Sequence, residues 1–443
     1  MKQSAAKQTL KITAVNGIVR ALGMLLRILL SRLLGAEIMG IAELSQSVHM
    51  LAITPLTSGL PLAVSRMTAK ARPEDRTKPL LAGLWLVRIA ALMLMPLMLL
   101  FSPQLARLTG DVRVLPSLWC SAPCILILGY SAVYNGYLYG VERSLLPAWS
   151  ELVEQLLRLT ICVGLLLALP HLAAPWAAAV PVFSTMAAEV LGLAFVLAVL
   201  RLPLSPMETA RSWRKPVLRL ALPTTGTRLV QMLLRAVEAV WIPLRLQASG
   251  LAAREATARL GMLSGMVTPV LMLPCVFTGS LSMVLLPRIA LAEKEPKELR
   301  RLVGKCFLTA APAGLGSTGA VWLAAPLLAR WLYRLPELTP LFRFGAPLCL
   351  LFAFAHVSGG ILSALGLQKL SMLGSLPVSG LTLLLIWLLP ARPELRQYGV
   401  LLAQGIGQFC TLLWNLGVLF FRQKTRLSSD ESEKDALSAV QPL

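Results

Sequence analysis

The chain has 443 residues, of which 56% are hydrophobic and 14% are charged, and its formal net charge is +21. Since a soluble domain carries about 25% charged residues, this composition excludes an ordinary soluble protein and favours a membrane protein. Most basic residues lie in short segments between apolar runs, where they set membrane orientation, so we expect no nucleic-acid partner.

Apolar runs long enough to cross a bilayer follow one another along the chain. A hydrocarbon core of about 30 Å needs about 20 residues of helix. About twelve spans are predicted, at residues 9–34, 41–66, 80–101, 114–139, 151–169, 176–200, 216–246, 260–288, 303–330, 340–366, 370–390 and 397–421. The sequence therefore predicts an all-α polytopic membrane protein.

Lys and Arg are distributed unevenly between the two sets of connecting segments. They gather at the N-terminus, in the segments after each even-numbered span and in the tail, most densely at 66–78 and 288–305. Cytoplasmic loops carry this excess, so both termini are expected in the cytoplasm. The polar segment 422–443 is expected to be a disordered cytoplasmic tail.

An internal repeat divides the predicted spans into two halves. Residues 59–66 end in a Leu-Pro-Leu-Ala-Val-Ser-Arg stretch before a basic loop, and residues 283–288 read Met-Val-Leu-Leu-Pro-Arg in the same context. Residues 135–143 and 359–369 correspond at a similar separation, half the chain. This predicts two pseudo-symmetric six-helix bundles, 1–210 and 211–421, with the substrate site between them.

The first span of each half carries a polar stripe along one face. The stripes consist of Thr13, Asn16, Arg20 and Arg27 in the first span, and of Thr224, Thr227, Arg228, Gln231, Arg235 and Glu238 in the seventh. In each half the two arginines are seven residues apart, which places them two turns apart on one side of a helix.

These arginines are costly in a membrane unless they face water or a partner. Each would cost about 2.5–3.5 kcal/mol at the bilayer centre, so we expect the stripes to face a water-filled cavity. A guanidinium matches a phosphate with two parallel hydrogen bonds, which favours an anionic ligand. The alternatives are snorkelling, for Arg27, and structural pairing of Arg235 with Glu238.

Other charged residues within the spans allow either a structural or a functional interpretation. Glu154 and Arg158 are four residues apart and can form a structural ion pair or a gating contact. Glu238 is grouped with them because it can neutralise Arg235. Glu189 is an isolated intramembrane carboxylate that could bind a proton or cation, or could form a structural hydrogen bond.

The eighth span contains helix-breaking and small residues. Pro269 and Pro274 predict a kink, which is either a packing feature or a hinge. Gly261 and Gly265 form a small-xxx-small pattern, which indicates close helix contact. The scattered cysteines and histidines fit no metal site, and no P-loop or catalytic motif is present, so we expect a protein without cofactor or metal that is not an enzyme.

At these motifs the chain resembles the stage V sporulation protein B branch of the multidrug/oligosaccharidyl-lipid/polysaccharide flippase superfamily. The matching pieces are Arg20 to Gly23 with Leu33 to Gly35, Gly59 to Arg66, Asn135 to Arg158, Gly261 to Glu293 and Ser363 to Gly366. The resemblance implies two six-helix bundles in a V shape, alternating access and a bacterial cytoplasmic (inner) membrane. In the lipid II flippases, arginines of the first helix line a cationic cavity for the diphosphate, and Arg20 and Arg27 match that pattern approximately, with a spacing one residue longer.

We therefore expect a flippase for an undecaprenyl-diphosphate-linked saccharide, a peptidoglycan precursor or polysaccharide unit, in cell-envelope or spore-cortex synthesis. Its expected partners are this anionic lipid, membrane lipids and envelope-synthesis proteins. The main alternative is a cation-coupled multidrug exporter of the same fold. A membrane-embedded glycosyl-transferring enzyme and a scaffold without transport activity are further alternatives. Four arginines against one glutamate in the two stripes favour the anionic cargo.

Overall fold

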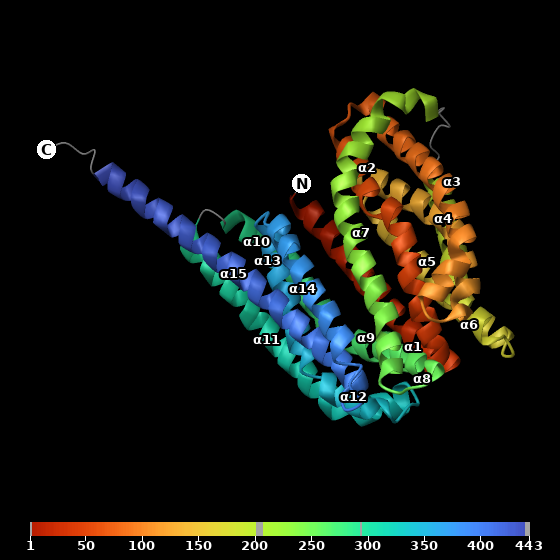
Figure 1. The fold of residues 1–443 in the computed structure, drawn as a ribbon. Coiled ribbons are helices and arrows are strands. Elements are labelled where there is room, and N and C mark those ends of the chain that lie inside the picture. The colour runs from red at the N-terminus through yellow and green to blue at the C-terminus, as the bar shows by residue number, and fades with distance from the viewer. Residues whose placement is uncertain (1, 201–206, 293–294, 439–443) are drawn as a thin grey trace. The chain divides into compact units, whose positions relative to one another are not determined.

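The computed structural model describes residues 2–200, 207–292 and 295–438, and it contains helices but no strand within these ranges. This confirms the predicted all-α class. The chain divides into two compact units, Met1–Met266 and Val267–Leu443, and Figure 1 shows their helices. In this division α7 packs with the helices of the first unit. The two six-helix bundles with a boundary at 210/211, expected from the internal repeat, stay a prediction.

The first unit is built around α4. Its helices are α1 (Lys2–Thr57), α2 (Gly59–Lys70), α3 (Thr77–Leu108), α4 (Leu115–Gly140), α5 (Leu145–Ala168), α6 (Ala174–Leu200), α7 (Arg211–Ala248) and α8 (Ala253–Leu260). Helix α4 packs against α1, α2, α3 and α6, and α5 packs against α1 and α6. The π-helix Gly261–Val267 follows α8 directly and crosses the boundary between the units.

Helix α1 contains two of the predicted spans. Its backbone breaks at Gly35, where φ is 73°, a conformation that glycine adopts without a steric penalty. The break falls between the predicted spans 9–34 and 41–66, and both are helical as expected. Helix α2 then begins after Ser58 and completes the second span.

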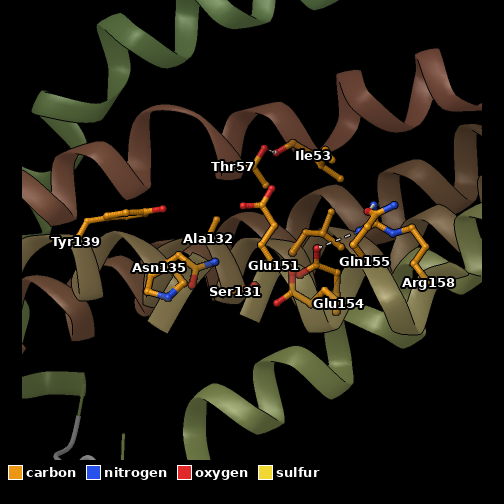
Figure 2. Close-up of a pocket in the computed structure, with 13 residues that line it drawn as sticks. Ile53, Thr57, Ser131, Ala132, Asn135, Tyr139, Glu151, Glu154, Gln155 and Arg158 are labelled. Carbon is orange, nitrogen blue, oxygen red and sulfur yellow. Dashed lines mark hydrogen bonds and ion pairs between the residues drawn. The ribbon is translucent and has the colours of Figure 1, made fainter. Parts of the chain in front are cut away.

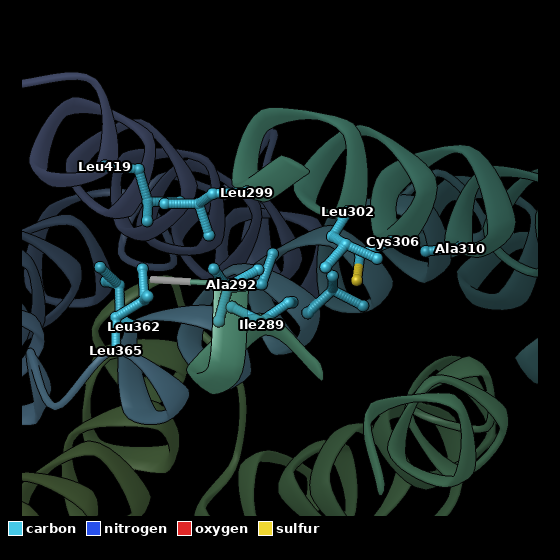
Figure 3. Close-up of a cluster of buried hydrophobic side chains, with 11 residues drawn as sticks. Ile289, Ala292, Leu299, Leu302, Cys306, Ala310, Leu362, Leu365 and Leu419 are labelled. Carbon is cyan, nitrogen blue, oxygen red and sulfur yellow. The ribbon is translucent and has the colours of Figure 1, made fainter. Parts of the chain in front are cut away.

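The second unit has a core of its own. Its helices are α9 (Thr268–Leu271), α10 (Pro274–Leu291), α11 (Pro296–Leu327), the π-helix Leu328–Leu332, α12 (Leu338–Gly345), α13 (Leu348–Ala364), α14 (Gln368–Leu388) and α15 (Arg396–Ser438). Buried residues of α10, α11, α13 and α15 form one cluster, in which Ile289, Ala310 and Ile361 are fully buried (Figure 3).

Helix α15 extends beyond the last predicted span. The segment 422–438 continues the last span as helix, and 439–443 lie outside the described residues. The expectation of a disordered cytoplasmic tail at 422–443 stays a prediction.

Five described helices meet a strict test of length and hydropathy for crossing a membrane. They lie within Pro73–Leu108, Val112–Gly140, Ala174–Leu200, Lys297–Leu332 and Gln368–Leu388, and α12 with α13, bent by 47°, adds a sixth. Large apolar side chains such as Leu100 and Leu323 are exposed, as in a protein surrounded by lipid. The chain is thus a multi-pass membrane protein, and the count of twelve spans stays a prediction.

Candidate functional site

The arginine stripes lie on two helices that pack side by side in the first unit, α1 and α7 (Figure 1). Arg20, Arg228 and Arg235 are exposed, and Asn16 and Gln231 are partly buried. Gly17 lies near Arg20, and Gly226 lies near Arg228. A Cβ added at either glycine would meet no atom within 4 Å outside the backbone of its own helical turn. At Arg20, Arg228 and Arg235 the charged sides of the two helices are therefore open rather than packed against protein.

Arg27 makes two contacts within the first unit. Its Nη1 donates to the carbonyl oxygen of Ser264 at 3.1 Å and lies 3.4 Å from Oε1 of Glu43. A π-helix pairs a carbonyl with the N–H five residues later, and the residue five positions after Ser264 is Pro269, which has no N–H. Arg27 supplies the donor that the proline lacks, so it joins α1 to the π-helix rather than pointing away from the protein.

Three glycines, Gly40, Gly261 and Gly265, let the backbone of α1 lie close to α8 and to the π-helix 261–267. We call this contact the glycine seam. A Cβ on Gly40 would overlap the carbonyl oxygen of Thr257, and one on Gly261 would overlap the carbonyl oxygen of Ala36. A Cβ on Gly265 would lie 2.7 Å from the Met39 side chain. The predicted close contact at Gly261 and Gly265 is confirmed, and its reason is that only glycine leaves room for it.

An ion cluster lies near the break in α1. The Arg113 guanidinium pairs with Asp111 at 2.7 Å and also with Glu37 of α1. Glu37 in turn lies 3.9 Å from Nε of Arg254, at the start of α8. These charges join α1, the turn before α4 and α8 at the end of the same seam. Sequence spacing gave no sign of this cluster, because its members come from three separate segments.

A polar pocket lies inside the first unit, between α1, α4, α5 and α6 (Figure 2). Its volume is about 310 Å³. It is lined by Ile53, Thr57, Leu128, Ser131, Ala132, Asn135, Tyr139, Pro147, Glu151, Glu154, Gln155, Arg158 and Glu189. The pocket brings together Glu154, Arg158 and Glu189, three of the charged residues singled out from the sequence, and adds polar groups of α4 that the sequence did not indicate.

The pairing of charges in this pocket differs from the expectation. Arg158 Nη2 lies 3.6 Å from Oε1 of Glu189, and its Nη1 donates to Oε1 of Gln155 at 3.3 Å. Glu154 instead accepts a hydrogen bond from Ser150 Oγ at 2.7 Å. The expected pair of Glu154 with Arg158 on one helix is therefore replaced by a pair between α5 and α6, because tertiary packing places the Glu189 carboxylate within reach.

The broken helix at the boundary of the units contains the two predicted prolines. Pro269 stands at the start of α9 and Pro274 at the start of α10, so the predicted kink is confirmed. Their role as a hinge stays a prediction.

Glu238 lies partly buried on α7. Among the residues that the structure describes, no three His, Cys, Asp or Glu side chains are grouped to hold a metal ion.

Comparison with curated proteins identifies relatives over most of the chain. The stage V sporulation protein B of Bacillus subtilis (strain 168) is 28% identical over 91% of this chain and 81% of the relative. The sporulation protein YkvU of the same organism is 23% identical over 86% of each chain. The resemblance read from the motifs is thereby confirmed.

Solved structures share the fold. An inward-facing multidrug resistance MATE family transporter matches with a TM-score of 0.73 and 16% identity, over 94% of this chain and 99% of that one. The lipid II flippase MurJ matches with a TM-score of 0.76 and 14% identity, over 93% and 87%. At 16% and 14% identity, these similarities show the shared fold.

The family model described as polysaccharide biosynthesis protein matches residues 5–293. That range contains both arginine stripes, the glycine seam and the polar pocket of the first unit. The chain belongs to this polysaccharide biosynthesis protein family.

Proposed function

We propose that the chain is a flippase that carries an undecaprenyl-diphosphate-linked saccharide across the bacterial cytoplasmic membrane. The observation that carries the proposal is the pair of arginine stripes on the adjoining helices α1 and α7, in which Arg20, Arg228 and Arg235 are exposed. Membership of the polysaccharide biosynthesis protein family supports a saccharide cargo. Diphosphate is the part of such a lipid that guanidinium groups recognise.

The stripes suit a headgroup that carries both charge and sugar. Arg20 and Arg27 are two turns apart, about 10 Å along one helix, and Arg228 and Arg235 have the same spacing. Asn16 and Gln231 add amide groups that can donate to, or accept from, sugar hydroxyls. The arginines would bind the diphosphate, and the amides would bind the saccharide beside it.

The relatives suggest the biological setting. Stage V sporulation protein B is named for sporulation, and MurJ is described as a lipid II flippase, so a peptidoglycan precursor for cell-envelope or spore-cortex synthesis is the proposed cargo. The distribution of basic residues supports cytoplasmic termini. Proteins of envelope synthesis are the partners proposed with this cargo.

Rescue of bacteria depleted of their lipid II flippase tests this proposal. Expression of the chain is expected to restore growth, and a variant with Arg20 and Arg27 both changed to alanine, present at the same level in the membrane, is not. Failure of the wild-type chain to restore growth would contradict a lipid II cargo. If that failure came with a gain in resistance to cationic drugs, the multidrug exporter would replace the flippase.

The broken helix offers a separate prediction about the proposed hinge. Pro269→Ala supplies an N–H that can bond the Ser264 carbonyl and so compete with Arg27. We expect the variant to insert normally and to flip substrate about tenfold more slowly, since the competing bond costs on the order of 1 kcal/mol. Pro377→Ala, at an exposed position in α14, is the matched control. An unchanged rate in the Pro269 variant would exclude the hinge role.

A further inference from the structure

The polar pocket of the first unit contains more negative than positive charge. Glu154 and Gln155 are 6% and 7% exposed, and Glu189 and Arg158 line the same cavity. With Glu151 the pocket is lined by three carboxylates and one guanidinium, and the two inner carboxylates, Glu154 and Glu189, share that guanidinium. Burial of an unpaired charge is costly. Since Arg158 pairs with Glu189, the carboxylate of Glu154 needs a further positive charge.

The pocket reaches the surface at one end. Tyr139 and Glu151 line it and are exposed, whereas Glu154 lies one turn deeper and is buried (Figure 2). Glu151 at the opening, followed by Glu154 and Glu189 farther inside, attracts a positive charge from the surface into the cavity. The cavity of about 310 Å³ has space for several water molecules along this path.

A second observation points to a bound species in the pocket. Asn135 lines it, and its Oδ1 is buried without a hydrogen-bond partner among the described residues. Nε of Arg158 is buried without a partner as well. Buried polar atoms are rarely left unpaired, so these two atoms mark places for water or an ionised ligand.

The geometry favours a proton over a metal ion. Glu154 packs so closely on α6 that a Cβ on Gly192 would overlap its carboxylate, which leaves no room for an ion on that side. The Arg158 guanidinium beside Glu189 would repel a metal cation at the same place. A proton needs no additional volume, and the Ser150 hydroxyl that contacts Glu154 can donate or accept a hydrogen bond.

We propose that this pocket binds one exchangeable proton, shared between Glu154 and Glu189. A hydronium ion in the cavity transfers its proton to a Glu154 carboxylate oxygen and leaves as water, and release reverses this step. Arg158 then neutralises the carboxylate that stays ionised. The site would supply a driving ion for the proposed transport, and its existence can be tested without transport.

Several other groups face this site and could influence it. On α1 the buried His49 lies within electrostatic range of Arg158, and on α4 Cys124 lies within electrostatic range of Glu189. Helix α4 also contributes Tyr139, and α5 contributes Glu151. None of these side chains belongs to the pair Glu154 and Glu189. Variants of the pair therefore distinguish a proton bound by the pair from one bound by a neighbouring side chain.

Infrared difference spectroscopy on the purified full chain, titrated with acid and base, tests the proposal. The wild type is expected to show the carbonyl stretch of one protonated carboxyl that is lost on raising the pH. Glu154→Gln removes the protonated group, and Glu189→Gln frees Arg158 to neutralise Glu154, so each single variant and the double variant lose the same signal. Glu255→Gln, an exposed position on α8, is the control that keeps it.

This pattern is not additive, and a merely structural role would not produce it. Persistence of the signal in either single variant, or its absence in the wild type, would overturn the proposal. Loss of the signal on adding Na⁺ at constant pH would show a metal-cation site instead. If one variant does not fold, as judged by gel filtration, the other still decides. Failure to rescue flippase-depleted cells with the proton signal intact would count against the proposed function alone.

Discussion

Arg27→Ala is expected to slow the flipping of a diphosphate-linked saccharide strongly while the protein inserts normally. The variant removes a guanidinium from the stripe on α1 and the donor to the Ser264 carbonyl. A hydrogen bond to a charged group contributes about 1.5–3 kcal/mol, so loss of one such contact lowers transport about 10- to 150-fold. Arg27→Lys retains the positive charge but cannot form the bidentate hydrogen bonds of a guanidinium, and we expect intermediate activity.

The measurement is the rate at which a fluorescent undecaprenyl-diphosphate saccharide crosses the bilayer of reconstituted liposomes. Arg20→Ala is expected to reduce that rate similarly, since it removes the other guanidinium of the stripe. Arg330→Ala, an exposed arginine of the second unit, serves as the control. Normal rates in both the Arg20 and the Arg27 variants would disprove the cationic site.

Gly261→Ala is expected to slow transport by separating α1 from the π-helix. The added Cβ would overlap the Ala36 carbonyl oxygen, and a backbone atom cannot move aside as a flexible side chain can. Overpacking of this kind costs about 1–3 kcal/mol, so the seam is destabilised and transport falls by at least about tenfold. The same shift would displace the Ser264 carbonyl from Arg27.

Gly164→Ala is the matched control for this variant. Gly164 lies inside α5, and a Cβ added there would meet no atom within 4 Å, so the change adds helix propensity without a clash, worth about 1 kcal/mol of stability. Thermal unfolding and flipping rates of the two variants would be compared. A Gly261 variant as stable and as active as the Gly164 variant would show that the close approach has no role.

Sequence patterns predicted the helices well because the hydrophobic period is local information. The break between the first two spans follows from Gly35, and the break in the eighth follows from Pro269 and Pro274. Helix α5 shows the limit of this approach, since its charged residues Glu154 and Arg158 lower the hydropathy that marks a span and also form part of the pocket.

Partners of the charged side chains could not be predicted in the same way. Arg27 meets Ser264, which is 237 residues away, and Arg158 meets Glu189 rather than the carboxylate on its own helix. Such contacts depend on how helices pack and not on spacing within one helix. The stripes were visible because each lies on a single helix, whereas the packing of α1 against α7 became clear only from the structure.

Flipping by the wild-type chain in liposomes of defined lipid composition tests the account most directly. The chain is expected to move an undecaprenyl-diphosphate saccharide and to leave a lipophilic organic cation on its original side. Addition of the same saccharide on an uncharged lipid is expected to give no transport, because the arginines would have no phosphate to bind. Transport of the cation, or equal transport of charged and uncharged saccharide lipids, would contradict the account.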